Sequence, residues 1–161
     1  MNVCAVFDNE EVGSLSKQGA DSTLLGDVLN RALASLGLSD TQIRAALASS
    51  FMVSADNAHA VHPNHPEKYD ELNRTFMNGG VVIKHNANQK YTTDAVSDAI
   101  FAEIFAKAGV PVQHFANRSD VLGGPTLGTL ANAPVSMNTV DIGLAQLALP
   151  SRYETEGCAA V

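Results

Sequence analysis

The sequence is poor in several features that would have assigned it to a broad class of protein. It has no tryptophan and only two cysteines, Cys4 and Cys158, which are too few for a disulfide framework. No apolar run approaches the length of a membrane span, and the chain does not begin with a basic segment followed by an apolar stretch. Positive charge is in the minority, because 10 Lys and Arg face 17 Asp and Glu for a net charge of −7. Nucleic acids and anionic membranes select basic surfaces, so neither is an expected partner. The low number of cysteines and the lack of a targeting segment lead us to expect a cytoplasmic protein.

The chain does contain enough apolar sequence to fold as one domain. Its 161 residues are 45% hydrophobic and 17% charged, which is typical of globular proteins. Short apolar segments predict strands at 3–7, 51–55, 81–84, 112–115 and 140–142, and helical patterns cover 20–36, 39–49 and 93–109. Strands that alternate with helices predict an α/β fold in which a largely parallel central sheet is flanked by helices.

Local signals support these helices. Ser39 and Gln42 have the spacing of a capping box, and Gly109 can end the third helix. The apolar face of that helix is expected to include Val96, Ile100 and Ile104. The chain begins on a predicted strand, and residues 153–157 could begin a further helix, so we expect a piece of a larger domain.

An acidic turn follows the first predicted strand. Its sequence is Asp8-Asn9-Glu10-Glu11, and two adjacent carboxylates can divide the work of a metal ligand and a general base. The alternative is an acidic turn that only caps the following segment.

A second polar cluster follows the predicted strand at 51–55. It contains Asp56, His59, His62 and His65, and both aspartate and histidine can bind a metal. Pro63 prevents a continuous helix here, so the three imidazoles cannot share one site by helical periodicity. The alternative for His62 and His65 is a solvated loop.

Three other features are weaker signals. The segment 123–128 has the sequence Gly-Gly-Pro-Thr-Leu-Gly, which fits neither a P-loop nor a dinucleotide fingerprint. We therefore expect a tight turn in which the backbone approaches its neighbours closely. The alternative is that this segment forms the wall of a pocket. Lys84 could recognise a substrate carboxylate, but a lone lysine is more often the solvent end of a strand. Tyr91 is uninformative alone.

Taken together, these segments resemble the C-terminal catalytic part of the M18 metalloaminopeptidases, the aspartyl aminopeptidase group. The matching stretches occur in the family's order and cover nearly the whole chain, at 7–14, 54–64, 82–91, 118–120 and 139–143. The resemblance implies a partial zinc-peptidase-like domain in which 1–161 is the C-terminal part of a catalytic domain, without the upstream segment and the inserted second domain. It also implies a peptide substrate and a homo-oligomeric intact protein.

The resemblance also implies roles for six residues in a site that holds two zinc ions. Glu10 matches the general base, Glu11 a ligand of one metal and Asp56 a ligand of the other. The residues that match the substrate pocket are His59, Lys84 and Tyr91, and Lys84 suits an acidic N-terminal residue of the peptide.

The chain departs from the family's pattern at other ligands. The family uses a histidine and a bridging aspartate from an earlier segment, and nothing here matches them. Pro150 stands where a further histidine ligand is expected, and proline cannot bind a metal. We therefore expect this chain to be inactive or nearly so alone, and a non-catalytic homologue that serves as a structural or assembly subunit is the alternative.

Overall fold

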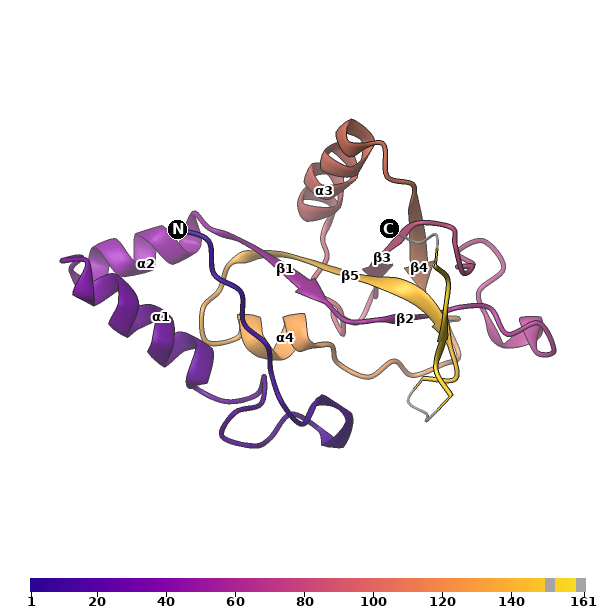
Figure 1. Cartoon of the computed structure of the whole chain (residues 1–161), viewed down its shortest axis with the longest axis horizontal. Coiled ribbons are helices and arrows are strands. Elements are labelled where there is room, and N and C mark those ends of the chain that lie inside the picture. The colour runs from indigo at the N-terminus through magenta and orange to yellow at the C-terminus, as the bar shows by residue number, and fades with distance from the viewer. Residues whose placement is uncertain (150–152, 159–161) are drawn as a thin grey trace.

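A computed structural model describes residues 1–149 and 153–158, and it shows a six-stranded sheet with helices on both of its faces (Figure 1). The main sheet runs in the order β1-β5-β3-β4, and two short strands pair with the long strand β5. The strands are β1 (Phe51–Ala55), β2 (Ala58–His59), β3 (Val81–His85), β4 (Val112–Ala116), β5 (Asn138–Leu147) and β6 (Thr155–Glu156).

The pairing of these strands confirms a mostly parallel α/β sheet. β5 is parallel to β1 and β2, and β3 is parallel to β4. β5 is antiparallel to β3 and β6, which the sequence did not indicate. The strand predicted at 140–142 is the middle of β5, so its prediction was right in kind but too short.

The predicted helices form, with ends set by their caps. The helical segments are η1 (Glu10–Val12), α1 (Leu24–Ser35), α2 (Asp40–Ala48), η2 (Pro66–Lys68), α3 (Ala95–Ala108) and α4 (Leu127–Asn132). Before α2, the Gln42 side chain accepts a 2.9 Å hydrogen bond from the Ser39 N–H, as the predicted capping box requires. Gly109, with φ of 70°, ends α3 in the left-handed conformation that favours glycine.

The sheet separates two apolar clusters. Alternate residues of a strand point to opposite faces, so Val82 and Ile83 of β3 enter different clusters. Val82 packs with Ala58, Tyr91, Phe115 and their neighbours, whereas Ile83 packs with Val140 and with Phe101 of α3. Figure 1 shows α3 and α4 on opposite sides of the strands. The side chain of Lys84 therefore shares the face of Val82, and that of His85 shares the α3 face.

The predicted strand at 3–7 is wrong. These residues pair with no strand, and Val3 and Val6 are exposed, as is Cys4. An apolar run forms a strand only where another strand satisfies its backbone groups, and none does so here among residues 1–149 and 153–158. The acidic turn therefore follows an irregular segment.

Other burial predictions also need correction. The apolar run at 51–55 forms a strand with one exposed face, because Phe51 and Val53 alternate with the less exposed Met52 and Ser54. Val96, Ile100 and Ile104 are exposed as well, and α3 instead packs through Phe101, Ala102 and Phe105. The segment 153–157 contains β6 rather than the start of a helix. No helix among the described residues is long and apolar enough to cross a membrane.

Candidate functional site

A buried ion pair lies at the centre of the candidate site. Lys84 is only 3% exposed, and its Nζ donates a hydrogen bond to Asp56 Oδ2 at 3.2 Å. Burial lowers the pKa of Lys84, while the charges of Asp56, Asp141 and Glu10 oppose that shift. The interpretation of Lys84 as the solvent end of a strand is therefore wrong, and its charge faces three carboxylates.

The backbone around Asp56 is held by β5. The Asp56 N–H donates to the carbonyl of Ile142 at 3.0 Å, directly after the register of β1 against β5 ends. This anchor places the Asp56 carboxylate on the same face as Lys84, although 28 residues separate the two in the sequence.

The acidic turn lies close enough to this ion pair for Glu10 to interact electrostatically with Asp56 and Lys84. Glu10 lies at the start of η1 and is partly buried, whereas Glu11 is exposed. Burial raises the pKa of Glu10, and the neighbouring carboxylates of Asp56 and Glu11 raise it further. A carboxylate whose pKa is raised binds a proton more readily, which suits a general base that must hold the proton it takes.

Tyr91 and His59 border the same charges. The ring centroid of Tyr91 is 5.7 Å from Lys84 Nζ, and its hydroxyl donates to Asn117 Oδ1 at 3.4 Å. Burial raises the pKa of Tyr91. His59, in β2, is exposed, yet the atoms packed around its ring and then the Lys84 cation lower its pKa. His59 and Asn117 also line a small cavity beside Arg118.

His62 and His65 do not join this group. Their ring centroids are 5.6 Å apart, and His65 Nδ1 lies 3.3 Å from Glu67 Oε1 on the exposed loop. The loop alternative describes this arrangement better than a shared site.

Only part of the glycine segment packs closely, and the expected tight turn does not form, because residues 122–126 are irregular and nothing lies within 4 Å of a Cβ at Gly124. A Cβ at Gly123 would lie 2.2 Å from Asn117 Nδ2. Next to it, Arg118 makes an exposed two-bond contact with Asp120 at 2.6 and 2.5 Å.

Asp141 is a buried carboxylate that the sequence analysis did not assign to the site. It is 1% exposed, and its Oδ2 accepts from the N–H and the hydroxyl of Thr92 at 2.6 and 2.7 Å. Its Oδ1 has no hydrogen-bond partner among the described residues. Its position inside the apolar run 140–142 could have indicated this, because a carboxylate buried in a strand needs hydrogen bonds or an opposite charge to compensate its lost hydration.

The carboxylates of this site can bind a metal, but they do not form a complete metal centre. Asp56 is paired with Lys84, and Glu11 is exposed. Within residues 1–149 and 153–158, the group of three donors that converges lies elsewhere, at His85, Asp98 and His114. A zinc ion needs at least three protein donors, so Glu11 and Asp56 fit only part of a zinc site. Pro150 lies outside the described residues.

Gly143 of β5 allows the close approach that positions Asp56. A Cβ at this position would lie 2.1 Å from the Asp56 carbonyl oxygen and 2.9 Å from Asn57 Cα. We expect Gly143→Ala to displace this segment and to lower the free energy of unfolding by about 1–3 kcal/mol in urea denaturation.

Gly124→Ala is the matched control for that substitution. Nothing lies within 4 Å of a Cβ at Gly124, so we expect the free energy of unfolding to change by less than about 0.5 kcal/mol. Equal effects of the two substitutions would contradict the steric role of Gly143.

Comparisons with known proteins agree on one family. The family model described as aminopeptidase I zinc metalloprotease (M18) matches residues 1–161. The probable M18 family aminopeptidase 2 of Clostridium acetobutylicum is 49% identical over 156 residues, which are 97% of this chain and 36% of that protein. The probable aspartyl aminopeptidase of Ricinus communis is 44% identical, over 96% of this chain and 31% of that protein.

A solved structure leads to the same family. The S. cerevisiae mApe1 dodecamer superposes with a TM-score of 0.73 at 32% identity, over 88% of this chain and 31% of that chain. The chain thus spans about a third of the length of these relatives. Since the family model matches it from end to end, the chain belongs to the M18 family of aminopeptidases.

Proposed function

We propose that this chain is the C-terminal part of the catalytic domain of a metalloaminopeptidase that removes N-terminal acidic residues from peptides. The observation that carries this proposal is the convergence of Glu10, Asp56 and Lys84, which come from three distant parts of the sequence. Membership of the M18 family supports an aminopeptidase, and a relative named as an aspartyl aminopeptidase supports the acidic preference.

Glu10 would act as the general base. Its raised pKa makes the carboxylate a stronger base, so it can take a proton from the attacking water and give it to the leaving amine. Burial raises the pKa of Glu10, and the neighbouring Asp56 and Glu11 carboxylates raise it further, which strengthens Glu10 as a base.

Lys84, His59 and Tyr91 would form the substrate side of the site. Lys84 carries the buried positive charge that an acidic side chain seeks, and Tyr91 packs beside it. His59 is exposed, so its imidazole can donate a hydrogen bond to a peptide group or accept one from it.

Zinc would be held partly by Glu11 and Asp56, with one ion at each, and the other ligands would come from outside the described residues. When bound, a pair of zinc ions polarises the scissile carbonyl and lowers the pKa of the attacking water. Binding at Asp56 would require the Lys84 contact to loosen, because both compete for the same carboxylate.

We further propose that the intact protein is a cytoplasmic homo-oligomer. A dodecameric relative supports this assembly, and so do the exposed apolar side chains that this chain presents, such as Val12, Leu15 and Ile104.

The test is a chimera in which this chain replaces the matching third of the Clostridium acetobutylicum relative. We expect it to hydrolyse peptides with N-terminal Asp or Glu faster than those with N-terminal Leu, and to bind two zinc ions per chain in the active site, once Pro150→His restores the expected ligand. Preference for Leu would contradict the acidic specificity. A folded chimera without hydrolysis would favour the second candidate, a non-catalytic subunit, which the incomplete donor set supports.

A further inference from the structure

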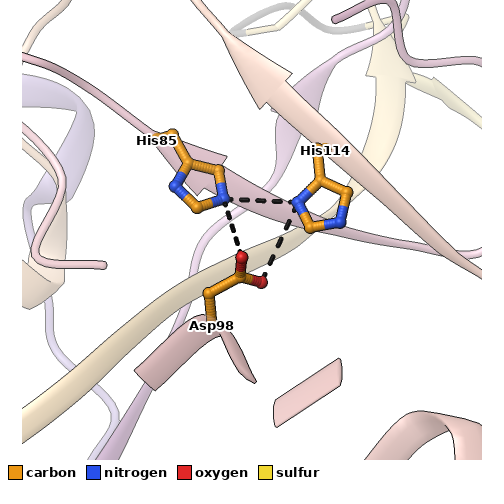
Figure 2. Close-up of side chains that lie close together, drawn as sticks. All are labelled: His85, Asp98 and His114. Carbon is orange, nitrogen blue, oxygen red and sulfur yellow. Dashed lines mark hydrogen bonds and ion pairs between the residues drawn. The ribbon is translucent and has the colours of Figure 1, made fainter. Parts of the chain in front are cut away.

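A second group of metal-binding side chains lies on the α3 face of the sheet (Figure 2). It consists of His85 at the end of β3, His114 in β4 and Asp98 in the first turn of α3. Since side chains alternate along β3, His85 points away from the face that carries Lys84. The group is therefore separate from the site proposed above.

The three side chains point toward a common space. His85 Nε2 lies 3.3 Å from His114 Nδ1, and the Asp98 oxygens lie 3.7 Å from His85 Nε2 and 3.9 Å from His114 Nδ1. Figure 2 shows both rings and the carboxylate facing inward. Zinc at about 2.0–2.1 Å from tetrahedral ligands places those ligands about 3.3 Å apart. The nitrogen pair already has this spacing, and a shift of about 0.5 Å would bring the carboxylate to it.

A hydrogen bond between His85 and His114 leaves part of the hydrogen-bonding capacity of the three side chains unused. One proton between the two imidazoles serves only that pair, and Asp98 Oδ1 has no hydrogen-bond partner among the described residues although it is buried. A cation in the centre would contact both nitrogens and the carboxylate at once.

We propose that His85, Asp98 and His114 bind a divalent transition metal, with zinc as the first choice. Two imidazoles and one carboxylate suit zinc, nickel or copper(II) and disfavour magnesium and calcium, which prefer oxygen donors. Side-chain exposures of 34% for His85 and 47% for His114 leave room for entry and for a water as the fourth ligand.

The role of this metal follows from the elements it joins. The ion would link β3, α3 and β4, which are consecutive in the chain and form one parallel crossover unit. A ligand that binds only the folded state stabilises it, so zinc would act as a structural clamp on this unit.

The test is zinc binding by the 161-residue chain, measured by equilibrium dialysis and by thermal unfolding. We expect His85→Gln and His114→Gln each to lose one equivalent of bound zinc. His65→Gln is the matched control, since it removes another surface histidine close to a carboxylate, and it should bind as the unchanged chain does. Asp56→Asn removes a ligand of the proposed active site and should still bind the zinc equivalent held by His85, Asp98 and His114. The experiment can therefore contradict one of the two proposals without contradicting the other.

Two further readouts keep the result interpretable. Zinc at 100 times its dissociation constant should raise the unfolding midpoint by about 5–10 °C in the unchanged chain and not in His114→Gln. Copper(II) loaded into Asp56→Asn should show coupling to two nitrogens by electron paramagnetic resonance. Unchanged zinc stoichiometry in folded His85→Gln and His114→Gln, or no zinc binding by the unchanged chain, would overturn the proposal.

Discussion

Glu10→Gln should lower kcat about 10²–10⁴-fold in the chimera that carries Pro150→His. The amide cannot accept a proton, but it keeps the size of the side chain, so the fold and bound zinc should be unchanged. The measurement is kcat on a peptide with N-terminal Asp, together with zinc content by mass spectrometry.

Glu103→Gln is the control for that experiment. Glu103 lies on the exposed side of α3, where it pairs with Lys107 at 3.2 Å, and it has no contact with the candidate site. Its substitution should leave kcat within a factor of two. If Glu10→Gln retained most of the activity of the parent chimera, Glu10 could not be the general base.

Asp56→Ala should lower the free energy of unfolding of the 161-residue chain by about 2–3 kcal/mol in urea. The substitution leaves the ammonium of Lys84 buried without its hydrogen-bonded partner. Removing both charges in the double variant Asp56→Ala, Lys84→Met should recover more than half of this loss, because no buried charge then remains unpaired.

An exposed ion pair provides the contrast. Asp120→Ala breaks the contact with Arg118, but both side chains are on the surface, so the cost should stay below about 1 kcal/mol. Equal losses for Asp56→Ala and Asp120→Ala would show that burial of Lys84 adds nothing to the strength of its pair.

The sequence predicted the helices and strands better than it predicted which of their side chains are buried. β3 and α2 follow from local signals, namely a short apolar run after a turn and a capping box. Burial does not follow from such signals, because it depends on what packs against each face. Val96, Ile100 and Ile104 have helical spacing, yet they are exposed because α3 meets the sheet through Phe101.

The same limit applies to the candidate site. The residue types at Glu10 and Asp56 indicated acid–base and metal chemistry, and the family resemblance assigned their roles. The contact between Asp56 and Lys84 depends on the strand order β1-β5-β3, which no local pattern specifies. The group of His85, Asp98 and His114 depends in the same way on the β3-α3-β4 crossover, so separate residues in the sequence give no sign of it.

The position of β5 in the sheet has a consequence for synthesis on the ribosome. β1 and β3 do not pair with each other, and both pair with β5, which begins only at Asn138. A nascent chain that ends before this residue has no strand to bring Asp56 toward Lys84. The two halves of the ion pair thus come together only after β5 has been synthesised, through the pairing of distant segments that makes such sheets slow to form.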